Sequence, residues 1–362
     1  MDKNTYCVIM AGGIGSRFWP LSKTKTPKQF IDILGTGKTL IRQTFERFQI
    51  ICPNENYYIV TNKEYKNIVL EQLPELKEEQ VLLEPMRRNT APCIAYANYH
   101  ILLKNPDANI VVAPSDHLIL KETEFINVIN NGLQFVKNNN ALLTLGIKPH
   151  RPDTGYGYIQ INNKEIKSKK NITKVKTFTE KPNLELAKFF LDSGEFFWNS
   201  GLFIWSLKSI NKAFNTHLPD INSLFKEGTA QYNTKNEEEF IEKTYSKCKN
   251  VSVDIGIMEK AENVFVLCSD FGWSDLGTWG SLYEHFDKDK SKNAISGKNV
   301  MLYDSKNCII NVPNEKLVVI QGLNDFIVVE SENTLLICKK EDEQNIKQIV
   351  NDVKIKKGEN FI

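Results

Sequence analysis

The sequence lacks the long apolar segments and the charge bias that would assign it to a membrane or to nucleic acid. It contains no apolar run of about 18 residues, so no membrane-spanning helix is expected. Lys and Arg total 46 against 44 Asp and Glu, and the formal net charge is +2. Such an even balance argues against a general nucleic-acid surface, so any anion site must be local. The first residues show no signal-peptide pattern, and a cytoplasmic protein is therefore expected.

Patterns of structural metal sites and disulfides are also missing. The seven cysteines are odd in number and none forms a CxxC pair, which favours reduced thiols in the core. The five histidines show no HxxxH spacing, so a zinc site is not expected. No low-complexity linker and no strict repeat interrupts the 362 residues, which suffice for a large domain and a smaller one.

Short apolar runs alternate with helical patterns in the first part of the chain. The patterns predict strands at residues 5–10, 57–60, 80–83, 109–113 and 141–146, and helices at 39–51, 90–103 and 125–137. This alternation predicts an α/β fold with a Rossmann-like, mixed and mostly parallel sheet. Residues 156–161 and 172–179 predict antiparallel strands around a polar hairpin.

The pattern changes near residue 288. Five short β-rich pieces follow between residues 300 and 338, separated by polar turns, and a last helix is expected at about 343–353. We therefore predict a large domain at residues 1–287 and a small β-rich domain at residues 288–362.

The most informative stretch is "MAGGIGSRFWPLSKTKTPKQF", residues 10–30, which follows the first expected strand. A glycine-rich loop in this position lets backbone N–H groups converge on phosphate oxygens. The dinucleotide motif GxGxxG fails because its last position is Phe18, and the Walker A motif fails because its first glycine would be Asp32. Gly35-Thr36-Gly37 is therefore expected to be a surface turn.

The glycines and basic residues of this loop follow a third pattern. Gly12-Gly13-x-Gly15-x-Arg17, then Pro20-Leu21 and Pro27-Lys28, resembles the signature of the sugar-1-phosphate nucleotidylyltransferase family. The resemblance implies a nucleotide site that contains Gly12, Gly13, Gly15, Ser16, Arg17 and Lys28. The planar guanidinium of Arg17 suits the leaving β- and γ-phosphates, and the ammonium of Lys28 suits the α-phosphate. Lys23 and Lys25 are expected to be solvated.

Further stretches narrow the resemblance to the mannose-1-phosphate guanylyltransferase family. They occur in the order "LLEPMRRNTAPCIAYA", "APSDHLI", "TGYGYIQ", "FTEKP", "FFWNSGLFIW" and "FGWSDLGTW". The resemblance is dense over residues 1 to about 285. It is weak in the tail, which resembles the family's small left-handed β-helix-like domain.

Two aspartates are candidates for a metal site. Asp116 follows the strand expected at 109–113, at the end where open α/β sheets bind ligands. The resemblance implies that Asp116 and Asp275 hold one Mg²⁺ beside the phosphates, a role that suits carboxylate oxygens. The catalytic set expected is Arg17, Lys28, Asp116 and Asp275.

Separate residues are expected to recognise the base and the sugar. The carboxylate of Glu84 can accept from N1–H and N2–H of guanine, and Asn89 and Thr90 either contact the base or only cap the helix that begins there. Arg87 is expected on the surface. The resemblance implies a sugar-phosphate pocket that contains Gly157, Glu180, Lys181 and Asn199.

The resemblance as a whole implies a specific reaction. GTP and α-D-mannose 1-phosphate would give GDP-mannose and diphosphate, with Mg²⁺ as cofactor, in a homodimer without nucleic-acid or membrane partners. Two alternatives stay open: the same chemistry on glucose 1-phosphate with UTP, dTTP or ATP, and a catalytically silent regulatory paralogue. The presence of Arg17, Lys28, Asp116, Lys181 and Asp275 argues against the silent paralogue.

Overall fold

The computed structural model describes residues 1–161 and 171–362; the predicted hairpin tip lies outside the described residues. By its contacts the chain divides into two compact units. The first unit comprises Met1–Gly12, Arg42–Ser115 and Ile119–Trp273, and the second comprises Gly13–Ile41, Asp116–Leu118 and Ser274–Ile362. Because these units combine segments that are distant in the chain, the domain boundary predicted at residue 288 stays a prediction.

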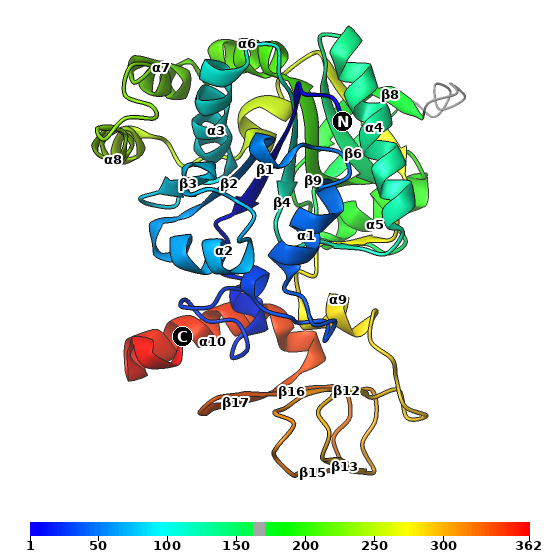
Figure 1. Cartoon of the computed structure of the whole chain (residues 1–362). Coiled ribbons are helices and arrows are strands. Elements are labelled where there is room, and N and C mark those ends of the chain that lie inside the picture. The colour runs from blue at the N-terminus through cyan, green and yellow to red at the C-terminus, as the bar shows by residue number, and fades with distance from the viewer. Residues whose placement is uncertain (162–170) are drawn as a thin grey trace. The chain divides into compact units, whose positions relative to one another are not determined.

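A nine-stranded sheet forms the centre of the first unit, in the order β3-β2-β1-β4-β9-β6-β10-β8-β7 (Figure 1). The strands are β1 (Thr5–Ala11), β2 (Tyr57–Asn62), β3 (Val81–Glu84), β4 (Asn109–Pro114), β6 (Leu142–Ile147), β7 (Tyr158–Ile161), β8 (Ile172–Thr179), β9 (Phe196–Ser206) and β10 (Val264–Ser269). Only β8 and β9 run against the other strands of this described sheet. The prediction of a mixed, mostly parallel α/β sheet is therefore confirmed.

Helices cover both faces of this sheet. They are α1 (Leu40–Phe48), α2 (Lys66–Gln72), α3 (Thr90–Lys104), α4 (Glu122–Asn138), α5 (Leu184–Ser193), α6 (Leu207–His217), α7 (Pro219–Glu227) and α8 (Glu237–Lys247). Tyr6 and Val8 of β1 face a large apolar core to which α3, α6, α7 and α8 contribute, while α4 packs on β4, β6 and β9. Strands buried on both faces explain the continuous apolar runs in the sequence.

The cysteines and the helices agree with the composition. All seven cysteines are free thiols, and most are buried. Within the described part of the chain, no helix has both the length and the apolar character that a membrane span requires.

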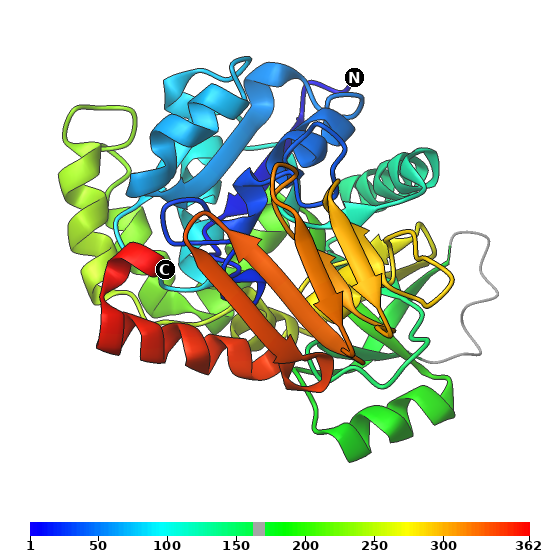
Figure 2. The same ribbon diagram turned by 90° about the horizontal axis from the view of Figure 1, so that it is seen from below.

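The second unit contains short strands that form successive turns of a coil. They are β12 (Ala294–Ser296), β13 (Val300–Tyr303), β14 (Ile309–Asn311), β15 (Val318–Gln321), β16 (Phe326–Ser331) and β17 (Thr334–Lys339). The strands β12, β14 and β16 pair in parallel, as do β13 and β15, and β17 closes the larger sheet antiparallel to β16. This parallel stacking, visible in Figure 2, confirms the small β-helix-like domain.

The same unit holds the glycine-rich loop. Phe18 and Trp19 of the loop are buried in a core with Trp279 of α9 (Trp279–Tyr283), Ile327 of β16 and Ile346 of α10 (Ile346–Lys357). Two short strands, β5 (Leu118–Ile119) and β11 (Trp273–Ser274), lie where the chain passes from one unit to the other.

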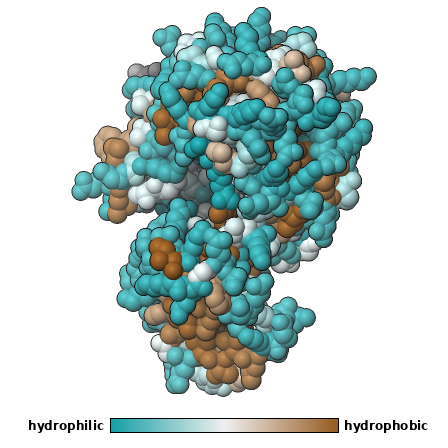
Figure 3. All heavy atoms as spheres, turned by 90° about the vertical axis from the view of Figure 1, so that its left-hand side faces the viewer, coloured by the Kyte–Doolittle hydropathy of each residue, from teal (hydrophilic) through white to brown (hydrophobic). Residues whose placement is uncertain are grey.

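Apolar side chains are exposed on the C-terminal strands, and Figure 3 shows brown surface on this part of the chain. Met301, Tyr303 and Val319 lie on the small sheet of β13 and β15, while Leu335 and Ile337 form an exposed apolar face on β17 of the other sheet; each is between 46% and 57% exposed. An apolar face of this kind commonly marks an interaction surface.

Candidate active site

The glycine-rich loop is held by bonds to its own carbonyl oxygens. The Gln29 side chain donates to the Gly13 carbonyl at 2.9 Å, and Ser22 Oγ donates to the Ile14 carbonyl at 2.6 Å. Gly15 has φ +71°, and a Cβ there would lie 2.5 Å from Cβ of Lys28. Only glycine satisfies both constraints. Carbonyl groups engaged inside the loop are compatible with amide groups that face a bound phosphate.

The residues that follow form a short 3-10 helix, Ser16–Phe18. Arg17 Nε donates to Gln344 Oε1 at 2.9 Å, and the indole of Trp19 donates to the Phe361 carbonyl at 2.7 Å. Lys23, which was expected to be solvated, is largely buried and forms an ion pair with Glu332. The C-terminal segment therefore fixes the loop that carries Arg17.

Lys28 links the Asp116 carboxylate to the backbone of the turn at Asp275. Its Nζ lies 2.8 Å from Asp116 Oδ2, 2.8 Å from the Asp275 carbonyl oxygen and 2.9 Å from the Leu276 carbonyl oxygen. The Lys28 side chain is only 3% exposed, and Asp116 is 30% exposed. Residues 28, 116 and 275, which are far apart in the sequence, thus meet at one buried ammonium.

The electrostatics of this cluster keep Asp116 ionised. Burial acts to raise the pKa of Asp116, but the charges of Lys28 and His117 and the Lys28 hydrogen bond together lower the pKa below its ordinary value. The Lys28 ammonium donates to three acceptors, the Asp116 carboxylate and the carbonyl oxygens of Asp275 and Leu276. The sequence reasoning, which assigned Lys28 to the α-phosphate, did not anticipate this geometry.

The donor set near Lys28 fits a hard divalent cation that also binds substrate. Asp116 and Asp275 supply carboxylate oxygens, and one oxygen of Asp275 accepts from the Gly277 amide at 2.8 Å. Across the residues that the structure describes, no group of three or more His, Cys, Asp or Glu side chains could hold a metal ion. Two carboxylates would leave most positions of a divalent metal ion to phosphate and water.

In the first unit, Glu84 ends β3 with a buried carboxylate. Tyr245 of α8 donates its hydroxyl to Glu84 Oε1 at 3.0 Å. Burial raises the pKa of Glu84 to about 7, although the Tyr245 hydrogen bond and the Arg87 charge act in the opposite direction. A buried acceptor whose charge changes near neutrality is suited to read N–H donors of a base.

The residues after Glu84 have mixed roles. Arg87 is exposed, as expected, but its guanidinium donates to the Gly12 carbonyl at 3.2 Å and so supports the start of the glycine-rich loop. Asn89 adopts φ +70° and its side chain accepts from the Thr90 amide. Asn89 is therefore the N-cap of α3, whereas Thr90 Oγ1 accepts from the Val253 amide at 2.9 Å, a contact between segments rather than a cap.

The four predicted sugar-site residues include three that lie close together in the first unit. Glu180 and Asn199 approach the backbone of Gly157 closely. A Cβ atom added to Gly157 would lie 2.7 Å from Glu180 Oε2 and 3.5 Å from Cβ of Asn199. The Asn199 backbone amide donates to the Gly157 carbonyl at 2.8 Å. Lys181 is exposed, forms an ion pair with Glu180 and has φ +42°, a strained value for a residue with a side chain.

Asn199 lies at an irregularity of β9. Its partner on β6 is Gly146, whereas Thr144 pairs with Phe203, so β9 carries extra residues between the two pairs. Bulges of this kind re-aim side chains next to functional sites. Asn199 Nδ2 donates to Asp254 Oδ1 at 2.8 Å. No motif in the sequence drew attention to Asp254; only its place in a short acidic-apolar stretch could have suggested it.

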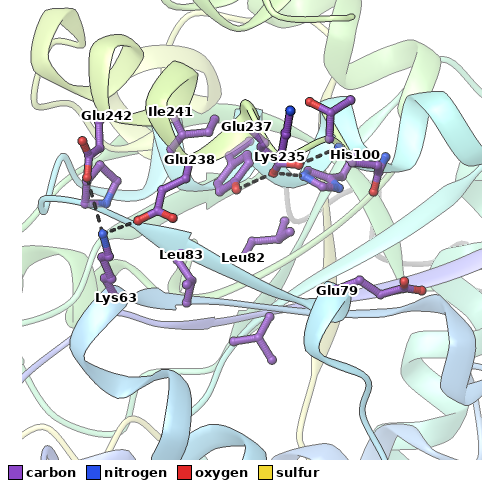
Figure 4. A pocket seen from close by; sticks show the side chains of 15 residues that line it. Lys63, Glu79, Leu82, Leu83, His100, Lys235, Glu237, Glu238, Ile241 and Glu242 are labelled. Carbon is purple, nitrogen blue, oxygen red and sulfur yellow. Dashed lines mark hydrogen bonds and ion pairs between the residues drawn. The ribbon is translucent and has the colours of Figure 1, made fainter. Parts of the chain in front are cut away.

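A separate pocket of about 410 Å³ lies along the outer edge of β3, between that strand and α8 (Figure 4). On one wall, Glu237 accepts from the Tyr96 hydroxyl at 2.7 Å and contacts His100 Nε2 at 2.5 Å. None of the predicted site residues lines this pocket.

The comparisons with known proteins agree with this geometry. Residues 6–292 match the nucleotidyl transferase family, and residues 297–353 match the MannoseP isomerase/GMP-like beta-helix domain. Because the first match covers most of the chain, the protein belongs to the nucleotidyl transferase family.

Individual relatives define the branch of that family. A mannose-1-phosphate guanylyltransferase from Escherichia coli is 33% identical over 354 residues, which cover 95% of this chain and 74% of that protein. The corresponding protein from Klebsiella pneumoniae is 35% identical over 352 residues, with 96% and 73% covered. A solved structure described as mannose-1-phosphate geranyltransferase from Thermus thermophilus has a TM-score of 0.86 at 27% identity, with 97% and 99% covered. Within the nucleotidyl transferases, the chain belongs to the mannose-1-phosphate guanylyltransferase family.

Proposed function

We propose that the protein transfers GMP from GTP to α-D-mannose 1-phosphate and releases diphosphate. A phosphate oxygen of mannose 1-phosphate forms a bond to the α-phosphorus of GTP. The bond from that phosphorus to the bridging oxygen of the leaving diphosphate breaks, and GDP-mannose results. The attacking phosphate is already ionised near pH 7, so the reaction needs positioned charge more than a base. The observation that carries the proposal is the meeting of Asp116 and the Asp275 turn at the buried ammonium of Lys28.

Residues of the second unit bind the phosphates. Asp116 and Asp275 would hold Mg²⁺, which when bound supplies positive charge to the phosphate oxygens. Lys28 keeps Asp116 ionised and orients it, and the backbone around Gly13 and Gly15 faces the nucleotide phosphates. Arg17 offers two parallel N–H groups to the leaving diphosphate.

The residues of the first unit recognise the two substrates. Glu84 accepts from the N–H groups of guanine, with Asn89 and Thr90 at the adjacent helix start. Glu180 and Asn199 bond the sugar hydroxyls beside Gly157, and Lys181 neutralises the sugar phosphate. These roles are supported by the burial of Glu84 and by the close approach of Glu180 to Gly157.

The direct test measures diphosphate release with each nucleoside triphosphate and each sugar phosphate in turn. We expect kcat/KM to be highest with GTP and mannose 1-phosphate. Replacing GTP by ATP, UTP or dTTP, or mannose 1-phosphate by glucose 1-phosphate, should lower kcat/KM at least about tenfold, because each replacement loses at least one hydrogen bond in a buried site. A preference for another pair would replace the proposed substrates. Absence of turnover with every pair would favour a silent regulatory protein.

We also propose a homodimer that buries the exposed apolar face of the C-terminal strands. Leu335 and Ile337 lie on the edge strand β17 and are 56% and 52% exposed, which favours pairing with a second copy. The substitution Leu335→Glu should convert a dimer to a monomer in sedimentation experiments. The matched change Leu184→Glu, on an exposed residue of α5, should leave the mass unchanged.

A further inference from the structure

Asp254 lies next to the proposed sugar site but belongs to none of the motifs that define it. It begins a short π-helix, Asp254–Met258, and its carboxylate is partly buried. Burial and the nearby charge of Glu180 raise the pKa of Asp254 to about 6, and the hydrogen bond from Asn199 and the charge of Lys181 act against this rise. Burying a carboxylate in this way costs folding free energy, and buried carboxylates with shifted pKa values are often found at functional sites.

The hydrogen bonds of Asn199 assign its amide unambiguously. Asn199 Oδ1 lies 3.2 Å from the Gly201 amide, which can only donate, and also accepts from Thr144 Oγ1 at 2.9 Å. The oxygen therefore points to Gly201 and Thr144, and the nitrogen points to Asp254. Nδ2 carries two hydrogens, and the carboxylate of Asp254 takes one of them.

The chain just before Asp254 is tied to the start of α3. The amide of Val253 donates to Thr90 Oγ1 at 2.9 Å, and the amide of Ala91 donates to the Val251 carbonyl at 3.2 Å. Both bonds anchor the segment that leads into the π-helix. A side chain whose backbone is anchored in this way can fix the rotation of a neighbour that it contacts.

We propose that Asp254 is a positioning residue that holds the Asn199 amide so that its second N–H donates to a hydroxyl of the sugar phosphate. The inference rests on the proposed function, because it takes Asn199 to be a sugar ligand. Asp254 acts through Asn199 and does not itself contact the reacting atoms. Without Asp254, the Asn199 amide is held only through Oδ1, by Gly201 and Thr144, and its nitrogen loses its acceptor. The sugar-facing N–H is then less precisely oriented.

The experiment compares Asp254→Ala, Asp254→Asn and Asn199→Ala with the unmodified protein. Asp254→Ala should raise the KM for mannose 1-phosphate about tenfold, the effect of losing one oriented hydrogen bond, and change the KM for GTP less than about twofold. Asp254→Asn should restore part of the loss, since its carboxamide oxygen can still accept from Asn199. In the Asn199→Ala background, Asp254→Ala should have no further effect on this KM.

Controls separate positioning from general damage. Asp220→Asn removes an exposed carboxylate that pairs with Lys249 and should change neither KM. Thermal unfolding of each variant shows whether the fold is retained, and if Asp254→Ala unfolds, Asp254→Asn alone carries the test through the same two KM values. Equal changes in both KM values, an unchanged KM for mannose 1-phosphate, or additive effects in the double variant would overturn the positioning role.

Failure of the proposed function is distinguishable from failure of this inference. Binding of mannose 1-phosphate is measured by calorimetry beside turnover. Binding without turnover overturns the proposed reaction, and the Asp254 variants are then compared through Kd. A protein that neither turns over nor binds mannose 1-phosphate overturns both.

Discussion

Three carboxylates at the candidate sites of the two units have pKa values shifted in opposite directions. In the second unit, Asp116 is paired with the buried Lys28, and its pKa lies below the ordinary value. In the first unit, burial raises the pKa of Glu84 to about 7 and that of Asp254 to about 6. Asp116 thus stays charged at every physiological pH. Glu84 and Asp254 change charge close to neutrality. With the roles proposed for them, Glu84 at the base and Asp254 behind Asn199, sensitivity to pH should belong to recognition and not to phosphate chemistry.

The largest expected effect comes from removing the charged carboxylate. Asp116→Asn should lower kcat about 10³-fold, because a preorganised charge beside the reacting phosphates is lost while the shape is retained. Steady-state diphosphate release at saturating GTP and mannose 1-phosphate measures it. Near-normal turnover in this variant would remove Asp116 from the catalytic set.

The free energy of unfolding should differ between Asp116→Ala and Asp116→Asn. Asp116→Ala leaves the ammonium of Lys28 without its anionic partner, at 3% exposure, and should cost about 3 kcal/mol of unfolding free energy. Asp116→Asn keeps an acceptor and should cost less. Denaturant unfolding of both proteins provides the comparison, and equal stability of the two would show that Lys28 does not depend on the ion pair.

The second-largest effect is expected from a substitution in the glycine-rich loop. Gly15→Ala places a side chain at φ +71° against Cβ of Lys28 and should cost about 2 kcal/mol of unfolding free energy, with loss of activity. Gly13→Ala is the matched control for stability, because nothing lies within 4 Å of its Cβ position. If both changes cost the same, the close approach of Lys28 to Gly15 would not constrain the loop.

Much of this arrangement was predictable from local pattern. The apolar runs predicted β1, β2, β4 and β6 within a few residues, because buried parallel strands carry a sequence signal that needs no tertiary information. The helix predicted at residues 90–103 is α3, which begins at Thr90. The antiparallel pairing of β7 and β8 was also confirmed.

Other features depend on contacts that no local pattern contains. The engagement of Lys28 by Asp116 and by two carbonyl groups near residue 275 is a tertiary effect, and a lone lysine in a loop gives no sign of it. The role of Asp254 depends on a bulge in β9 and on a π-helix, neither of which has a recognisable sequence period. The bond between Arg17 and Gln344 joins residues that are 327 positions apart.

The pH dependence of GTP binding is the third test. Ionised Glu84 offers two acceptor oxygens and a negative charge to the N–H groups of guanine, whereas protonation turns one of these oxygens into a donor. The KM for GTP should therefore fall up to about tenfold as the pH rises from 6 to 8. Glu84→Gln should abolish this dependence, and it also controls for ionisation of the triphosphate. A dependence that persists in Glu84→Gln would assign it to another group.

Glu84 should also make the stability of the fold depend on pH. A rise in pH should strengthen GTP binding but lower the contribution of Glu84 to stability. The pKa of Glu84 rises from an ordinary value of 4.5 to about 7 on folding, so the folded state binds the proton more tightly. Its contribution to stability therefore decreases as the pH rises from about 4.5 to 7 and is constant above that range. Unfolding curves of the unmodified protein and of Glu84→Gln over this range should converge at low pH.

The smallest effect concerns Thr90, for which the sequence left a capping role and a base-reading role open. Because its hydroxyl accepts from the Val253 amide, Thr90→Val should leave that amide unpaired and cost about 1 kcal/mol of unfolding free energy. Thr90→Ser keeps the hydroxyl and should be nearly neutral. Val253 precedes Asp254, so a kinetic effect of Thr90→Val is expected on mannose 1-phosphate and not on GTP. A rise in the KM for GTP alone would instead place Thr90 against the base.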